Sequence, residues 1–301
     1  MDVTTACIAG KEIYRQWDQG RLAGKCLGCR QTPFGASGEI FLVENGPAAF
    51  YLLGRHCRGL GKTAPFKVNY RANLYAIKDL GVRYVLGWAP CGAITHNWQV
   101  GDLIILDDVI DQTVLRPRTF FEDSPLGYLR QFPVFCGTLR GAAAHVLEAR
   151  DLPFHNAGTA VVCEGPRLET PAEIRMFAAM GAQLVTHCCV PEVFMAKELE
   201  LCYAAIAYVV NYAETGSRSK PFAGGDLFGG ITDRSESHRL SRTVGAVGEI
   251  VRDVAAAMSA MPAAQKLCQC DHTMDYNRKQ YSLPTDWHEW FSVGAGGELG
   301  C

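Results

Sequence analysis

The stretch that decides the fold is residues 163–214, which read CEGPRLETPAEIRMFAAMGAQLVTHCCVPEVFMAKELELCYAAIAYVVNYAE. Thr170 stands directly before Pro171, and Glu173 follows three positions after Thr170. This is the pattern of a capping box with proline at the first helical position, so a helix is expected to begin here. Gly181 predicts its end, because glycine readily adopts the left-handed conformation that follows a last helical turn.

Two strands are expected in the same stretch, with a second helix between them that begins at Pro191. Residues 184–186 predict a short strand, and residues 203–210 form a continuous apolar run typical of a strand buried on both faces. Asn211 stands at the carboxyl end of that run, and ligands of open α/β sheets bind at this edge. Helices and strands alternate along the chain, which predicts a mixed or parallel sheet covered on both faces.

The composition narrows the class of protein. The chain has 301 residues, of which 48% are hydrophobic, and a formal net charge of −2, so it is long enough for a large α/β domain. The near-neutral charge predicts no nucleic-acid partner, and no apolar run approaches the ~20 residues that span a membrane. The N-terminus lacks the pattern of a signal peptide, so we expect a cytoplasmic protein. Its thirteen cysteines are then expected to be free thiols.

Six segments resemble the purine nucleoside phosphorylase and methylthioadenosine phosphorylase family in their order and spacing. They are TPFG at 32–35, Arg55-His56, VNYRAN at 68–73, Gly101-Asp102, EGPRLETPAE at 164–173, and PEV at 191–193 followed by AKE at 196–198. The resemblance implies a single α/β domain, here residues 1–261, with a mixed, partly barrel-like central sheet flanked by helices. It also implies a homotrimer. Residues 262–301 form a C-terminal extension that the resemblance does not cover.

The resemblance implies a reaction as well. Members of the family cleave the bond between a purine and C1′ of ribose with phosphate as the nucleophile, giving the free base and ribose 1-phosphate. Such chemistry needs a donor at the departing base and a nucleophile below the sugar. A purine nucleoside is therefore the expected partner, no cofactor is expected, and phosphate is the expected co-substrate.

Three residues match the family's base pocket: Leu168 lies against the ring, Glu169 accepts N1–H of a 6-oxopurine, and Asn211 faces N7 and the 6-position. Adenine-selective relatives carry Asp at the last position, and adenine N1 facing a carboxylate would cost about 1–3 kcal/mol. We therefore expect a 6-oxopurine nucleoside, including 5′-modified ones such as methylthioinosine. Structural roles for these residues stay open: a strand-end cap for Asn211, a part of the helix start for Glu169 and core packing for Leu168.

The phosphate side departs from the family. Arg55 and His56 are retained, but Ala89 and Pro90 follow the strand predicted at 82–87, where relatives offer a hydroxyl and a free backbone N–H. Proline has no N–H to donate. Cys188 replaces a further hydroxyl residue. Anion sites need several convergent donors, so these replacements are expected to weaken phosphate binding.

Two other residues offer a different nucleophile. Glu12 stands where relatives have a glycine-rich turn with a hydroxyl, and His187 stands where a methionine touches the sugar. Either side chain is able to orient water, which would make the protein a nucleoside hydrolase; another acceptor would make it a glycosyl-transferring enzyme. A non-catalytic nucleoside-binding homologue is the remaining alternative. Arg116, in a long loop over 111–133, is expected to be solvated.

Two cysteine pairs raise the question of a metal. Cys26 with Cys29, and Cys268 with Cys270 and His272, provide the ligand types that zinc prefers. The family has a strand at the first pair, and positions three apart in a strand point to opposite faces. We therefore expect no metal site.

Overall fold

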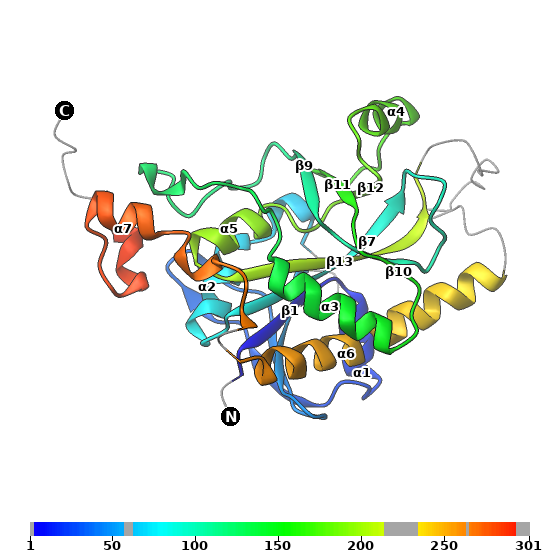
Figure 1. Ribbon diagram of the computed structural model, residues 1–301, viewed down its shortest axis with the longest axis horizontal. Coiled ribbons are helices and arrows are strands. Elements are labelled where there is room, and N and C mark those ends of the chain that lie inside the picture. The colour runs from blue at the N-terminus through cyan, green and yellow to red at the C-terminus, as the bar shows by residue number, and fades with distance from the viewer. Residues whose placement is uncertain (1–2, 57–62, 214–233, 263–264, 293–301) are drawn as a thin grey trace.

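The structure is a computed structural model that describes residues 3–56, 63–213, 234–262 and 265–292. An eleven-stranded mixed sheet runs through it, flanked by helices, which confirms the predicted fold class (Figure 1). The strands of this sheet are β1 (Thr5–Ala9), β2 (Gly24–Gly28), β5 (Ile40–Val43), β6 (Phe50–Gly54), β7 (Tyr84–Ala93), β8 (Leu103–Ile105), β9 (Asp108–Gln112), β10 (Phe154–His155), β11 (Thr159–Cys163), β12 (Leu184–Thr186) and β13 (Cys202–Tyr212). A separate hairpin joins β3 (Gln31–Thr32) to β4 (Gly35–Ala36).

The centre of the sheet is parallel. Strands β13, β7, β1 and β6 are neighbours in that order, and each neighbouring pair is parallel. Every residue of β13 from Cys202 to Val209 is buried, so the apolar run is the doubly buried strand that the sequence predicts. The carboxyl ends of these four strands therefore meet at one edge of the sheet.

Strand β7 is longer than the strand predicted at 82–87, because it continues through Ala89 and Pro90. A proline is tolerated there since β7 changes partner at this point. Its ladder with β1 ends at Gly87, and its ladder with β12 begins at Gly92. Among the described strands, none on that side of β7 pairs with position 90, and such a position is where proline fits within a sheet.

The far half of β7 carries a branch of the sheet. Strand β12 pairs antiparallel with β7, β11 pairs parallel with β12, and β9 pairs parallel with β11. This branch rises away from the parallel centre, and helix α4 lies beyond it at the top of the molecule (Figure 1). The loops that follow β11 and β12 belong to this branch.

Helices cover both faces of the sheet. They are α1 (Glu12–Asp18), α2 (Tyr70–Asp79), α3 (Gly137–Ala149), α4 (Pro171–Ala179), α5 (Glu192–Glu198), α6 (Arg234–Ala260) and α7 (Asp275–Tyr281), with 3-10 turns η2 (Pro65–Lys67), η3 (Pro125–Gly127), η5 (Cys270–His272) and η6 (Trp287–Ser292). Helices α1, α3 and α6 pack in one hydrophobic core, to which they contribute Ile13, Val146 and Ile250. Helices α2 and α5 pack in the other core, to which they contribute Leu74 and Val193. Among the described helices, none has both the length and the apolar character that a membrane crossing requires.

Helix α4 begins with the predicted capping box. The backbone N–H of Glu173 donates to Thr170 Oγ1 over 3.2 Å, and the backbone N–H of Thr170 donates to Glu173 Oε2 over 2.7 Å. Arg167 donates to both carboxylate oxygens of Glu173, at 2.8 and 2.7 Å. Glu173 is therefore part of the helix start, and the loop before α4 is fixed at its end.

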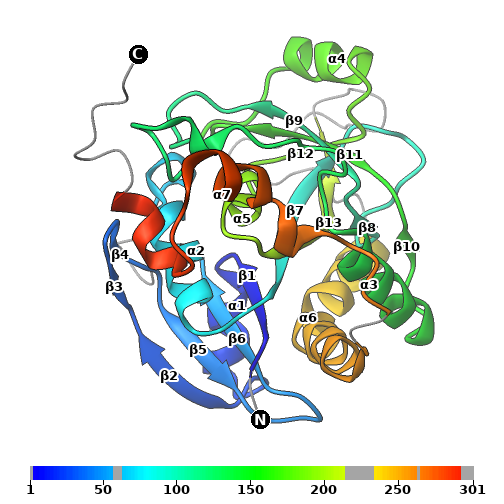
Figure 2. The same ribbon diagram turned by 60° about the vertical axis from the view of Figure 1, so that its left-hand side comes forward.

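The tail after residue 262 packs on the domain. Met274, Leu283 and Trp290 are buried in the same core cluster as α2 and α5, and the rings of Trp287 and Tyr75 lie 4.9 Å apart between centroids. In Figure 2 this segment covers α2. Within the described part of the tail, Trp287 and Trp290 therefore pack on the domain itself.

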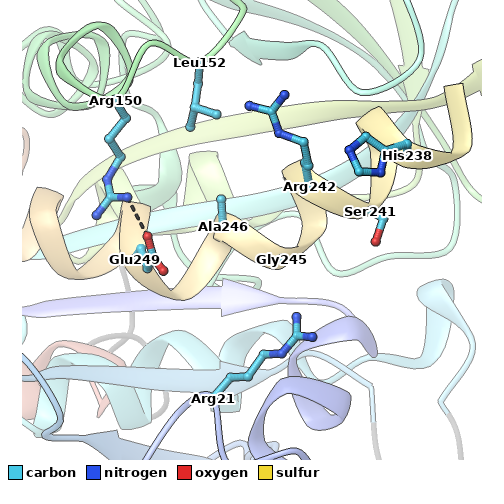
Figure 3. A pocket seen from close by; sticks show the side chains of 9 residues that line it. All are labelled: Arg21, Arg150, Leu152, His238, Ser241, Arg242, Gly245, Ala246 and Glu249. Atoms are coloured by element: carbon cyan, nitrogen blue, oxygen red, sulfur yellow. Dashed lines mark hydrogen bonds and ion pairs between the residues drawn. The ribbon is translucent and has the colours of Figure 1, made fainter. Parts of the chain in front are cut away.

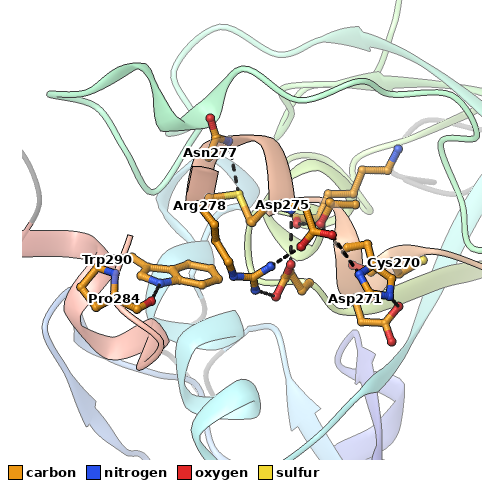
Figure 4. Close-up of polar contacts among 12 residues, drawn as sticks. Cys270, Asp271, Asp275, Asn277, Arg278, Pro284 and Trp290 are labelled. Carbon is orange, nitrogen blue, oxygen red and sulfur yellow. Dashed lines mark hydrogen bonds and ion pairs between the residues drawn. The ribbon is translucent and has the colours of Figure 1, made fainter. Parts of the chain in front are cut away.

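Polar contacts hold the same segment (Figure 4). Arg278 donates to Asp275 over 2.6 Å and to Glu200 at the end of α5, and its guanidinium carbon lies 5.2 Å from the ring centroid of Trp290. Trp290 Nε1 donates to the carbonyl of Pro284 over 2.8 Å. The tail thus has its own network in addition to its apolar contacts.

Candidate active site

The residues predicted for the site gather at the carboxyl edge of the parallel strands. Arg55 follows β6, Glu12 follows β1, Ala89 and Pro90 lie in the far half of β7, and Asn211 lies near the end of β13. Ligands of open α/β sheets bind at this edge, because strand ends and loops from several elements converge there.

Asn211 lies beside a β-bulge, since the register between β13 and β7 shifts between Val209 and Asn211. A bulge redirects the side chain next to it. Asn211 Oδ1 lies over Gly92, where an added Cβ would stand 3.2 Å from it. Among the described residues the Asn211 amide makes no hydrogen bond, so its donor and acceptor capacity remains for a ligand.

Asn211 and Glu169 line one narrow pocket. The other lining residues are Leu168, Ile174, Val185, Tyr212 and Ala213. The pocket is partly open and has a volume of about 30 Å³, enough to hold a water molecule. A purine is larger than this volume, so the pocket does not hold a base in the conformation described; Leu168, one of its lining residues, is 38% exposed.

Glu169 and His187 form a pair that the sequence does not predict. His187 Nε2 lies 3.1 Å from Glu169 Oε1, and the His187 ring packs so closely on Gly165 that an added Cβ would stand 2.8 Å from Nδ1. Burial raises the pKa of the Glu169 carboxyl, but the hydrogen bond and charge of His187, a backbone N–H and the Cys163 thiol together lower that pKa below its ordinary value. Glu169 therefore stays ionised at neutral pH.

Arg116 holds the two loops that carry these residues. Its side chain is fully buried and donates to the carbonyls of Cys163, Glu164, His187 and Val190 over 2.6–3.0 Å. Its Nε also pairs with Glu164 Oε1 at 3.2 Å. The expectation of a solvated Arg116 is wrong, because free carbonyls of the loops after β11 and β12 take up the guanidinium.

Arg55, on the nucleophile side, is already paired. Its Nε lies 2.5 Å from Glu192 Oε1 and its Nη2 lies 3.0 Å from Glu192 Oε2, with both side chains buried. Tyr203 donates to the same carboxylate over 2.7 Å, and Cys188 Sγ lies 3.6 Å from Arg55 Nη1. Burial would lower the pKa of Arg55, but Glu192 raises it well above its ordinary value. An anion that enters here meets a guanidinium whose charge is already compensated.

His56 has a ring nitrogen that is able to accept a hydrogen bond. Its Nδ1 lies 2.7 Å from the carbonyl oxygen of Thr63, which only accepts, so Nδ1 carries the hydrogen. Burial, and then the charge of Arg55, lower the pKa of His56, so the ring is neutral at pH 7. Its Nε2 is therefore an acceptor, which suits water better than the oxygens of phosphate.

The side chains at the three replaced positions supply no donor stronger than the thiol of Cys188. The carbonyl of Pro90 accepts from Thr186 Oγ1 over 2.8 Å, and the N and O atoms of one strand residue point to the same side. The nitrogen of Pro90 therefore faces the same gap without a hydrogen. Ala89 is fully buried, and burial raises the pKa of the Cys188 thiol, which stays neutral.

One carboxylate oxygen of Glu12 is able to accept a further hydrogen bond. Glu12 Oε2 is buried and has no hydrogen-bond partner within the part of the chain that the structure describes. An added Cβ on Gly10 would stand 2.8 Å from this atom, and burial, then the charge of Glu12, and also a hydrogen bond with the Glu12 carboxylate raise the pKa of Tyr208. Buried carboxylate oxygens are normally hydrogen-bonded, so this one is placed to accept from a ligand or a water.

A larger hollow lies elsewhere, along α6 (Figure 3). It holds about 480 Å³ and is lined by Arg21, Arg150, Leu152, His238, Ser241, Arg242, Gly245, Ala246 and Glu249. Arg150 is paired there with Glu249 at 2.6 Å. No residue predicted for the base or the nucleophile lines it, so residue chemistry, and not size, assigns the candidate site to the strand edge.

The comparison with protein families now identifies the chain. The family model of the phosphorylase superfamily matches residues 37–247. This is well over half of the chain, and the chain therefore belongs to the phosphorylase superfamily.

Individual relatives support the same family assignment. The 6-oxopurine nucleoside phosphorylase of Pyrococcus furiosus is 34% identical over 247 residues, which are 80% of this chain and 87% of that protein. The probable S-methyl-5′-thioinosine phosphorylase of Methanothermobacter thermautotrophicus is 37% identical over 213 residues, 71% and 73% of the two chains. Among solved structures, the methylthioadenosine phosphorylase of Schistosoma mansoni without ligand matches with a TM-score of 0.75 and 26% identity, over 93% of this chain and 100% of that one.

Proposed function

We propose that the protein cleaves the N-glycosidic bond of a 6-oxopurine nucleoside, with or without a modified 5′ group. The observation that carries this proposal is the charge of Glu169, since its hydrogen bond with His187 lowers its pKa. An ionised carboxylate accepts N1–H of hypoxanthine or guanine but finds no proton on N1 of adenine. Asn211, in the same pocket, donates to N7 as negative charge moves onto the departing base.

Phosphate is the nucleophile of the proposed reaction, as the names of the relatives suggest. It would approach C1′ from the side of Arg55 and His56 and leave as ribose 1-phosphate. The protein then acts mainly by positioning the reacting groups and by stabilising the charge on the base.

A second candidate is attack by water or another acceptor. Two observations favour it: Glu12 Oε2 is buried without a described partner, and His56 offers a lone pair at Nε2. Either group is able to take a proton from water, and a carboxylate repels a phosphate dianion. Arg55, compensated by Glu192, offers little to offset that repulsion.

One assay separates these functions. Purified protein is incubated with inosine, methylthioinosine or adenosine, with and without phosphate, and both the free base and the sugar product are quantified. The proposal expects hypoxanthine release that needs phosphate and yields ribose 1-phosphate, with adenosine the poorest substrate. Release of free ribose without phosphate would replace the first candidate by the second. Tight inosine binding with no release would mean a non-catalytic homologue.

Replacing His187 with alanine is expected to move the acid limb of kcat/KM for inosine to higher pH. The hydrogen bond from His187 depresses the pKa of Glu169, so the wild-type carboxylate keeps its charge as pH falls through the range where glutamate usually titrates, about 4.3. Without that bond, burial dominates and Glu169 takes up its proton at higher pH. His187→Gln, which keeps a donor, is expected to stay closer to wild type. An unmoved acid limb in His187→Ala would contradict this role.

A further inference from the structure

Four cysteine sulfurs converge at the end of β13 remote from Asn211. The Sγ atoms of Cys136, Cys202, Cys268 and Cys270 all lie within 4.8 Å of one another, and those of Cys202 and Cys268 are 3.5 Å apart. They come from three distant segments: the N-cap of α3, the first residue of β13 and the tail. Two belong to the pairs considered in the sequence, but the exposed Cys26 and Cys29 are not among them.

Backbone contacts hold the three segments together independently of the sulfur atoms. The N–H of Cys136 donates to the carbonyl of Tyr203 over 2.8 Å, which ties the start of α3 to the start of β13. The N–H groups of Leu267 and Cys268 both donate to Thr138 Oγ1, over 3.2 and 3.0 Å, which ties the tail to the first turn of α3. The four thiols are thus brought together by a scaffold that already exists.

We propose that these four cysteines bind one zinc ion in a closed tetrahedral site. Zinc–sulfur bonds of about 2.3 Å place the four sulfurs of a tetrahedron about 3.8 Å apart, within the range observed here. A disulfide would require about 2.05 Å between two sulfurs. An iron–sulfur cluster puts several iron atoms and sulfides between its thiolates and spreads them further than a single ion does.

The surroundings suit the charge of such a site. Zinc with four thiolates carries two negative charges, and the N-terminus of α3, a helix of 13 residues, favours negative charge at its cap Cys136. Lys266, two residues before Cys268, places a cation in the same segment, where it donates to Asp271 over 2.6 Å. Cys136 and Cys202 are buried, and thiolates favour zinc over magnesium or calcium.

The role of this ion is structural. All four positions of the tetrahedron are filled by protein sulfur, so no position remains for water or substrate. Cys202 is the first residue of β13 and Asn211 lies at its other end, so the ion is separated from the proposed chemistry by the length of the strand. It would fasten the tail, which carries Cys270 at the start of η5, to the sheet (Figure 4).

Elemental analysis of the full chain tests the proposal. The protein is purified under reducing conditions without added metal, and zinc, iron and acid-labile sulfide are measured per chain. We expect about one zinc, no sulfide, and release of zinc when the thiols are titrated with a mercurial reagent. The double variant Cys268→Ser/Cys270→Ser is expected to lose the zinc, whereas Cys26→Ser/Cys29→Ser, a matched pair of exposed cysteines, is expected to keep it.

Two further measurements keep the test decisive if the double variant does not fold. Wild-type protein loaded with cobalt(II) is expected to show the absorption of a tetrahedral cobalt–thiolate site, and Cys270→His is expected to keep one metal ion with a shifted spectrum. Metal-free protein with all thirteen thiols would overturn the proposal, as would metal-free protein with four thiols fewer, which means two disulfides. Iron with sulfide, or zinc retained in full by the Cys268→Ser/Cys270→Ser variant, would overturn it equally.

Discussion

Replacing Asn211 with alanine is expected to lower kcat for inosine by about 10²-fold or more. In the proposed reaction negative charge moves onto the purine as the glycosidic bond breaks, and the proposal assigns the donor at that ring to the amide of Asn211, beside the bulge in β13. The interaction strengthens in the transition state, so the loss should appear in kcat more than in KM. Steady-state kinetics at saturating inosine and at the preferred nucleophile concentration measure it.

Two further variants serve as comparisons for this test. Asn97→Ala changes the same residue type at an exposed position that does not line the pocket, and its kinetics should match wild type. Asn211→Asp should lose activity toward inosine and gain relative activity toward adenosine, because aspartate occupies this position in adenine-selective relatives. Wild-type turnover in Asn211→Ala would remove Asn211 from the mechanism.

Replacing Arg55 with methionine is expected to lower the free energy of unfolding by about 3–5 kcal/mol. Arg55 and Glu192 are both buried, with two N–O contacts of 2.5 and 3.0 Å, so the variant leaves the carboxylate of Glu192 without its counter-charge. The hydrogen bond from Tyr203 is too little to offset a buried, uncompensated charge. Denaturant unfolding followed by two probes measures the loss.

The double variant Arg55→Met/Glu192→Gln is expected to recover part of this loss, because it removes the carboxylate charge together with its partner. Lys25→Met is the control, since its contact with Glu44 at 3.8 Å is exposed and should contribute at most about 1 kcal/mol. A loss for Arg55→Met no larger than that of Lys25→Met would show that the buried pair contributes little.

Local patterns in the sequence predicted much of the fold. The capping box of Thr170 and Glu173 forms as predicted, and the apolar run after residue 202 is the strand at the centre of the sheet. Both patterns depend only on residues within one helix or one strand, so they can be recognised from the sequence alone. The resemblance to nucleoside phosphorylases adds the order of the remaining elements, and the match over residues 37–247 supports it.

Local sequence patterns do not predict the contacts between distant segments. Pro90 remains inside β7 only because two different strands pair with that strand before and after it. Arg116 is buried because carbonyls from residues 163–190 converge on it, and nothing adjacent in the sequence records this. Likewise the cysteines of the tail find their partners on α3 and β13, not at Cys26 and Cys29.

The docking of the tail has a consequence for synthesis of the protein on the ribosome. Met274, Leu283 and Trp290 complete the interior beside α2 and α5, although the strands they help to enclose are translated much earlier. A nascent chain that ends before Trp290 therefore exposes apolar surface and stays dependent on chaperones. Premature termination in this region would yield a protein prone to aggregation and proteolysis, and not a shortened enzyme.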